Sequence, residues 1–190
     1  MNDSMDFERV SAENVNLEGR TLTVGRLIHA SAGEIFELLA DPNQHIDADG
    51  MDMVRGAVDA EPITKIGDVF TMNMFAERMG GDYQMENHVT KFETDRSIAW
   101  MPARPGHEPH GVKWTWELES EADDATYVSL VYDWKGVTSE KMLAGKFPPF
   151  PVDSFVESLR TLADAVEDND EWDEWDDEHD ALDGVNEDGH

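Results

Sequence analysis

The feature that most constrains the fold is a change of hydrophobic period near residue 151. Between residue 50 and that point, apolar residues recur mostly at every second position, as in half-buried β-strands. After Pro151 they recur at helical spacing, in a stripe that contains Phe155, Leu159, Leu162 and Val166. One long amphipathic helix after a run of strands predicts an α+β protein in which an antiparallel sheet folds over that helix. A helix shorter than the concave face of the sheet leaves a hollow, and this hollow is the candidate site.

Two Ser-x-x-Glu patterns predict where helices begin. In such a capping box, the hydroxyl and the carboxylate each accept a hydrogen bond from an otherwise unpaired backbone N–H. Ser31 and Glu34 predict a short helix after a first strand over 21–30, and Ser154 and Glu157 predict the start of the long helix. Further strands are expected near residues 51–58, 69–75, 83–90, 98–100, 112–119 and 128–134, with a weak helix over 138–147.

The chain is strongly acidic, since 43 Asp and Glu against 14 Lys and Arg give it a net charge of −29. Such a charge repels nucleic acid and anionic membranes, so no nucleic-acid partner is expected. Residues 164–190 are the extreme case, because they include no Lys or Arg. Salt adaptation or a generally acidic proteome explains the charge, and an acidic recognition surface is the alternative.

A length of 190 residues predicts one domain. We expect a polar lead-in over 1–19, a folded domain over 20–167 and a disordered acidic tail over 168–190, which has too little apolar surface to bury. The absence of cysteine excludes disulfides and thiolate metal sites. The chain start lacks the apolar run of a signal peptide, and no segment approaches the roughly 20 apolar residues of a membrane span. This predicts a soluble, cytoplasmic protein without stable membrane insertion.

Six short motifs are spread over residues 20–166: Ile28–Phe36, Leu39–Pro42, Asp49–Gly50, Ile98–Trp100, Trp116–Leu118 and Tyr132–Trp134. Together with the expected order of elements, they resemble the START-like or Bet v 1-like superfamily, often labelled SRPBCC or polyketide cyclase/dehydrase. They are fold motifs, and none of them is a catalytic signature.

This resemblance implies a helix-grip fold, in which a seven-stranded antiparallel sheet wraps around the long C-terminal helix. One or two short helices follow the first strand in that fold. The resemblance also implies an internal apolar cavity for lipids, polyketides or other hydrophobic ligands. No cofactor is implied, and the acidic tail departs from the usual pattern of the family.

The inward face of the sheet should gather large apolar side chains around the ligand. By alternation, the expected ligand-binding residues are Met72, Met74, Met85, Asn87, Trp100, Trp114, Trp116, Tyr132 and Trp134. Methionine adapts its shape and aromatic rings offer flat contact, so such a lining suits an irregular apolar ligand. The alternative is that these side chains simply fill the core.

Asn87 and Tyr132 are the polar members of this set. A buried amide needs a hydrogen-bond partner, which for Asn87 is a neighbouring side chain, a water or a ligand carbonyl. The hydroxyl of Tyr132 could likewise donate to a ligand or to the backbone.

His45, Asp47 and Asp49 alternate near the expected mouth of the cavity and are candidate metal ligands. An EF-hand does not fit, because neither aspartate is followed by glycine at the sixth or glutamate at the twelfth loop position. His107 and His110 lie in a proline-rich loop without a third ligand. No metal site is therefore predicted.

Three functions follow from these observations. The first is binding of a hydrophobic small molecule without covalent chemistry. The second is a cyclase or dehydratase that uses Asn87, Tyr132 or His88, and such an enzyme should place a titratable group with a shifted pKa in the cavity. The third is a protein-interaction module, in which the Trp-containing acidic tail docks on a basic partner with steep salt dependence.

Overall fold

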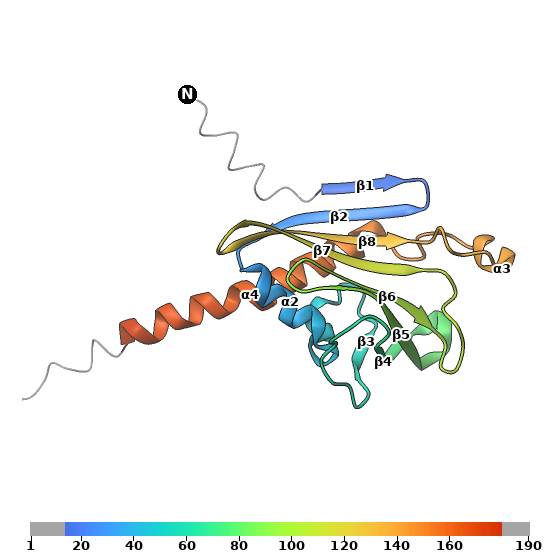
Figure 1. The fold of residues 1–190 in the computed structure, drawn as a ribbon, viewed down its shortest axis with the longest axis horizontal. Coiled ribbons are helices and arrows are strands. Elements are labelled where there is room, and N and C mark those ends of the chain that lie inside the picture. Colours follow the sequence, from blue (N-terminus) through green and yellow to red (C-terminus); the bar gives the residue numbers. More distant parts are fainter. Residues whose placement is uncertain (1–13, 180–190) are drawn as a thin grey trace, which may run out of the picture.

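Eight antiparallel strands form one sheet in the computed structural model, which describes residues 14–179 and the side chains of residues 15–167 (Figure 1). In chain order they are β1 (Asn14–Glu18), β2 (Thr21–Ile28), β3 (Val54–Ala57), β4 (Val69–Ala76), β5 (Gly81–Glu93), β6 (Ser97–Ala103), β7 (Lys113–Ala122) and β8 (Ala125–Asp133). Across the sheet their order is β1-β2-β8-β7-β6-β5-β4-β3. β2 pairs with β8, so a strand near the N-terminus lies beside the last strand of the chain.

Three α-helices and two 3-10 helices complete the described part of the chain: α2 (Ala32–Ala40), η1 (Pro42–Ala48), η2 (Glu77–Met79), α3 (Glu140–Leu143) and α4 (Val152–His179). α4 crosses one face of the sheet and continues past its edge (Figure 1). It packs on β2, β8, α2 and η1, and Phe155, Leu159 and Leu162 of its apolar stripe are fully buried. The predicted helix-grip fold is confirmed.

The sheet has eight strands instead of the expected seven because part of the predicted lead-in forms β1. β1 pairs with β2 through a two-residue loop that begins with Gly19 at a φ of 60°, a left-handed conformation that favours glycine. Val15 and Leu17 remain 50% and 58% exposed. Backbone pairing therefore holds this edge strand, with little help from side-chain burial.

The two predicted capping boxes have different outcomes. Ser31 caps α2 as expected: the Glu34 N–H donates to its hydroxyl over 3.2 Å, and the Ser31 N–H donates to the Glu34 carboxylate over 3.1 Å. The capping role predicted for Ser154 is wrong, because α4 begins two residues earlier at Val152. The N–H of Ser154 donates to the carbonyl of Pro151 inside the first turn.

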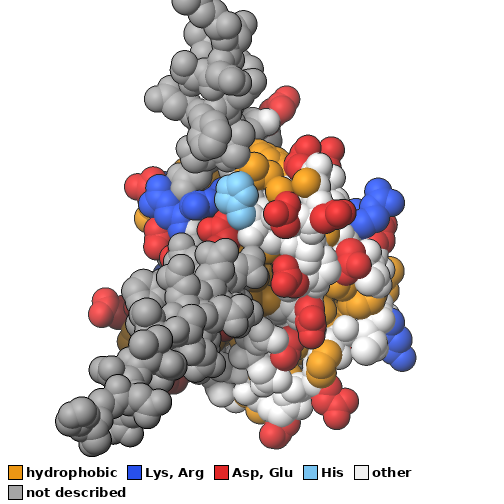
Figure 2. All heavy atoms as spheres, turned by 90° about the vertical axis from the view of Figure 1, so that its left-hand side faces the viewer, with side chains coloured by type: hydrophobic (Ala, Val, Ile, Leu, Met, Phe, Trp, Pro, Cys, Tyr) orange, Lys and Arg blue, Asp and Glu red, His pale blue; other side chains and the backbone are white. Residues whose placement is uncertain are grey.

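The described surface keeps the acidic character of the sequence. Figure 2 shows the end of the molecule that faces left in Figure 1, where Asp and Glu side chains outnumber Lys and Arg among the described atoms. No helix within residues 14–179 combines the length and the apolar content that crossing a membrane requires.

The backbone of α4 continues to His179, although its apolar stripe ends at Val166. The last described side chain, Glu167, accepts the N–H of His29 over 2.8 Å and so ties the helix to the residue that follows β2. The side chains of 168–179 and all of residues 180–190 lie outside the described part. The disordered acidic tail therefore stays a prediction.

We expect deletion of residues 170–190 to leave the melting temperature nearly unchanged. The deleted segment carries no Lys or Arg and few apolar residues, so it buries too little surface to offset the entropy of ordering it. The truncated chain keeps Glu167 and its bond to His29. Thermal unfolding of both proteins tests this, and a loss of many degrees would show that Trp172 or Trp175 packs onto the domain.

Candidate functional site

A cavity of about 910 Å³ lies on the face of the sheet that α4 crosses. Strands β3 to β8 line it together with η1, η2, α3 and Ser158 of α4. Its inner part includes buried side chains such as Leu39 and Leu130, while its outer part includes exposed side chains such as Arg104 and Lys146. The cavity therefore extends from the hydrophobic core to the protein surface.

Methionines and aromatic rings dominate the lining. Seven of the ten methionines of the chain line the cavity, and two of them, Met72 and Met85, face each other across β4 and β5. The register of β6, β7 and β8 aligns Trp100, Trp114 and Tyr132 in one row across the sheet. Residues in register on neighbouring strands point to the same face, so the strand pairing itself builds this wall.

Eight of the nine residues predicted to bind ligand line this cavity: Met72, Met74, Met85, Asn87, Trp100, Trp114, Trp116 and Tyr132. The ninth, Trp134, is buried but does not line it. Trp134 stacks instead on Phe147, with 5.8 Å between ring centroids, and Phe147 is itself a lining residue. Trp134 thus contacts a lining residue without lining the cavity itself. The binding role of all nine residues stays a prediction.

Aromatic contacts fix the wall to α4. The ring of Trp114 stacks on Phe155 with 5.6 Å between centroids, and Tyr132 packs edge-on against Trp114 at 4.7 Å. Phe155 is fully buried in the centre of the core. These ring contacts connect the aromatic wall of the cavity to the centre of the core.

His45 from η1 is a buried polar residue in the lining. Its Nε2 lies 2.7 Å from the carbonyl oxygen of Leu39, and because a carbonyl only accepts, Nε2 carries the proton and donates. The ring stacks on Trp100 with 4.9 Å between centroids. Burial lowers the pKa of His45 to about 4, so the imidazole is neutral at pH 7. The sequence suggested only a metal-ligand role for this residue.

Asn87 and Tyr132 are also buried and line the cavity. Among the described residues, neither side chain has a hydrogen-bond partner, so a buried amide and a buried hydroxyl remain available on the wall. His88, the third polar residue considered for catalysis, does not line the cavity. It follows Asn87 on β5, and strand alternation turns it to the other face.

Four titratable groups of the lining have shifted pKa values. Burial lowers the pKa of His45 and raises the pKa values of Tyr83 and Tyr132, while burial together with the nearby Arg104 charge lowers the pKa of His110. A shifted pKa inside the cavity was the feature expected of an enzyme. Each of these shifts, however, favours the neutral form and moves the group away from proton exchange near pH 7. They suit a wall that accommodates an apolar body.

Comparison with solved structures identifies the architecture. The chain superimposes on a protein from Arthrobacter aurescens with a TM-score of 0.62 at 13% identity, covering 84% of this chain and 92% of that one. It superimposes on the ZhuI aromatase/cyclase from Streptomyces sp. R1128 with a TM-score of 0.56 at 15% identity, covering 78% and 93%. This chain has the START-like, Bet v 1-like fold.

Sequence comparison adds a distant relative of this chain. An uncharacterized protein of Mycobacterium tuberculosis, Rv0088, is 29% identical over 107 residues, which cover 56% of this chain. The matched part covers 44% of that relative, so the chain spans less than half of the relative's length. No family model matches the sequence.

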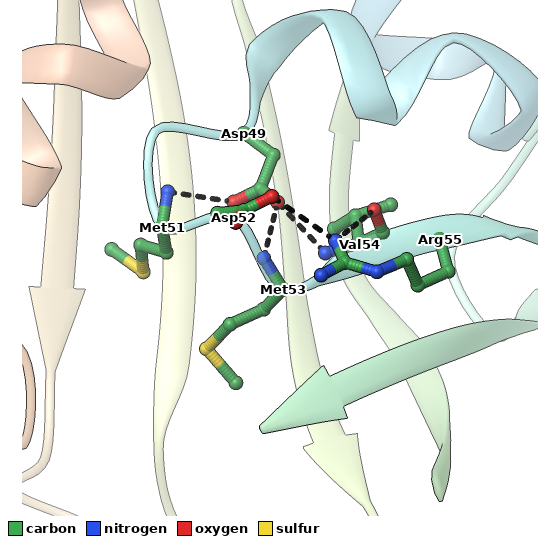
Figure 3. A network of polar contacts seen from close by, with 6 residues as sticks. All are labelled: Asp49, Met51, Asp52, Met53, Val54 and Arg55. Carbon is green, nitrogen blue, oxygen red and sulfur yellow. Dashed lines mark hydrogen bonds and ion pairs between the residues drawn. The ribbon is translucent and has the colours of Figure 1, made fainter. Parts of the chain in front are cut away.

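The Asp49–Gly50 motif organises the loop between η1 and β3. The carboxylate of Asp49 accepts the backbone N–H groups of Met51, Met53 and Val54 over 2.9, 2.8 and 2.7 Å (Figure 3). These three bonds turn the chain so that both methionines reach the cavity lining. Asp49 therefore has a structural task where a metal-ligand role was considered. Within the described residues, no three His, Asp or Glu side chains are grouped as a metal ion would need.

Gly50 brings this loop against α4. Its N–H donates to the hydroxyl of Ser158 over 3.0 Å, and that hydroxyl donates to the carbonyl of Ser154 over 3.1 Å. A Cβ at position 50 would lie against the backbone nitrogen of Ser158 and 2.5 Å from the Ser154 carbonyl oxygen. Only glycine fits this close approach, which holds the lining residues Asp49 and Met51 next to the lining residue Ser158.

Proposed function

We propose that the cavity binds a hydrophobic small molecule of lipid-, polyketide- or isoprenoid-like character, without covalent chemistry. The observation that carries the proposal is the cavity itself. Its volume of about 910 Å³ lies in the range of known small-molecule sites, roughly 300–1,000 Å³. Its lining combines adaptable methionines with rigid aromatic rings, which together fit an irregular apolar ligand.

Binding explains the lining better than core packing does. Protein interiors are close-packed and contain few voids larger than a water molecule. Here Met74, Met85, Trp100 and Trp114 remain partly accessible along a cavity although they sit on the core face of the sheet. An apolar ligand would give these side chains the contacts that the protein does not provide.

A second candidate is an enzyme of cyclase or dehydratase type. It is favoured by unpartnered polar groups on the wall, namely Asn87, Tyr132 and the buried Nδ1 of His110, and by the similarity to a structure named as an aromatase/cyclase. Against it stands the neutral character of His45 and Tyr132, since neither group is poised to take up or release a proton near pH 7. We therefore give these polar groups the role of hydrogen-bonding a ligand.

A third candidate is a protein-interaction module that acts through the acidic tail. The tail side chains lie outside the described residues, so this candidate rests on the sequence alone. A basic protein partner and a cytoplasmic location likewise remain predictions.

Native mass spectrometry of the freshly purified protein tests the main proposal. We expect the folded protein to carry a non-covalent adduct that is removed by organic extraction and restored by an added apolar ligand. A protein that emerges without an adduct, and that takes up no apolar dye such as Nile red, would contradict the proposal.

Replacing Trp116 with leucine separates a ligand-binding wall from ordinary core. Trp116 is 5% exposed and lines the cavity, so the smaller side chain enlarges an existing hollow. We expect dye binding to weaken more than the fold, whereas an ordinary core truncation would cost about 3 kcal/mol or more. Dye titration and the denaturation midpoint of both proteins provide the measurement.

Leu118→Ala is the matched control for that experiment. Leu118 lies on the same face of β7 and is buried, but it does not line the cavity. We expect this change to lower stability and to leave the dye affinity of the folded protein unchanged. The proposal would be contradicted if the wild-type protein binds no dye and the Trp116→Leu variant unfolds much more easily. Trp116 would then be an ordinary core residue.

A further inference from the structure

Most of the charged side chains around the cavity are positive, although the whole protein is strongly negative. Arg78, Arg104, Lys141 and Lys146 line it, whereas the only carboxylates in the lining are Asp49 and Glu108. In the full chain, acidic residues outnumber Lys and Arg by 43 to 14. The cavity thus gathers cations on a molecule that has few of them.

These four side chains do not pair with the acidic side chains of the described surface. Among the described residues, none of them forms an ion pair with a carboxylate, whereas Arg55, Lys135 and Arg160 each do. The two carboxylates of the lining do not neutralise them either. The carboxylate of Asp49 is occupied by three backbone N–H groups, and Glu108 forms no ion pair in the described part of the chain.

The four cations come from segments that meet at one end of the sheet. Arg78 belongs to η2 and Arg104 follows β6, while Lys141 and Lys146 lie in and just after α3. These segments lie at the right-hand end of the molecule in Figure 1, opposite the acidic end seen in Figure 2. All four side chains are exposed, so they surround the outer part of a cavity whose inner part is apolar.

Arg78 shows how closely the charge and the apolar wall are joined. Its guanidinium lies 4.8 Å from the centroid of the Phe150 ring, and Phe150 lines the cavity. Phe150 in turn packs against Phe155 of α4, with 6.1 Å between centroids. A cation on an aromatic face stays near the ring while its N–H groups remain free to bind an anion.

From this arrangement we infer that the natural ligand is an amphipathic anion, with an apolar body in the inner cavity and a terminal carboxylate or phosphate held by Arg78, Arg104, Lys141 and Lys146. The inference deepens the proposed function and rests on it. A neutral ligand would leave the cations without a role and would gain nothing from them. The four unpaired cations attract the anionic end of such a ligand. Without them, the net charge of −29 would repel an anion from this part of the protein.

Displacement of Nile red by three probes of equal chain length tests the inference: decanoate, decyl phosphate and decanol. We expect the two anions to bind about tenfold more tightly than decanol, since each exposed charge pair contributes modestly and several act together. The preference should shrink as salt is added, because exposed charges are screened, while decanol binding should hardly change. The two anionic arms show whether a carboxylate or a phosphate is preferred.

A double variant, Arg78→Gln with Lys146→Gln, should remove most of the preference for anions, because it should weaken the binding of decanoate and decyl phosphate far more than the binding of decanol. The control is Lys65→Gln with Arg96→Gln, which removes one Lys and one Arg at exposed positions that do not line the cavity. Both variants change the net charge equally, so a difference between them reports the position of the charges. If the first variant fails to fold, Arg104→Gln with Lys141→Gln makes the same test.

The outcomes separate the two proposals. If decanol binds as tightly as the anions, or if the control variant loses the preference equally, the inference is wrong and the binding of an apolar molecule stands. If neither the dye nor any probe binds the wild-type protein, the proposed function fails and the inference fails with it.

Discussion

Replacing Leu159 with alanine should lower the free energy of unfolding by about 2–5 kcal/mol. Leu159 is fully buried on α4, the helix that β2, β8, α2 and η1 surround. Truncation there removes apolar contacts and leaves a void that the neighbouring elements cannot fill. A loss of this size is a large share of the 5–15 kcal/mol that stabilises a typical domain. Chemical denaturation with a two-state fit measures it.

Leu17→Ala is the control with the same chemical change. Leu17 lies on β1 and is 58% exposed, so its truncation should change stability by about 0.5 kcal/mol or less. Equal midpoints for the Leu159 variant and the wild type would show that this face of α4 is not the buried one.

The second large effect is expected for Gly50→Ala, which should cost about 1–3 kcal/mol, as overpacking of a filled site does. The added methyl group would meet the backbone of α4 at Ser154 and Ser158, and a backbone cannot turn aside as a side chain can. Relief requires the loop to move away from the helix, which also breaks the bond from the Gly50 N–H to Ser158. Because this loop carries Met51 and Met53, dye affinity should fall together with stability.

Gly33→Ala makes the same substitution where there is room. Gly33 lies in the first turn of α2, and the nearest atoms to an added Cβ are 3.9 Å away. Alanine favours a helix over glycine, so this variant should be neutral or gain up to about 1 kcal/mol. If the two variants unfold at the same midpoint, the close approach of Gly50 to α4 does not contribute to the free energy of unfolding.

Periodicity predicted the fold because strands and helices repeat their contacts. The alternation along β7 and β8 and the stripe of α4 each specify one buried face, and those faces can only be buried against one another. β1 was not predicted, because it has no buried face that a repeating pattern could indicate. Its apolar residues, Val15 and Leu17, stay exposed, and only pairing with β2 defines it as a strand.

The candidate site was predictable where it lies on strands and not where it lies on loops. Alternation places Met85 and Trp116 on the inner face, and register then brings them to one wall. His45, Arg78 and Lys146 lie on η1, on η2 and after α3, where no period marks which way a side chain points. Their part in the cavity depends on long-range packing of those segments. The sequence therefore predicted the apolar wall of the cavity and did not predict that Arg78 and Lys146 line its outer part.

The cavity shares its walls with the core, and this couples occupancy to stability. Met72, Trp116, Leu130 and Tyr132 belong both to the cavity lining and to the buried core cluster. A ligand there completes the packing of the folded chain and has no equivalent site in the unfolded one. By thermodynamic linkage, a ligand at 100 times its dissociation constant adds about 2.7 kcal/mol to the free energy of unfolding. On the proposed function, a bound ligand would act as a removable part of the hydrophobic core, and the melting temperature would report how much of the cavity is filled.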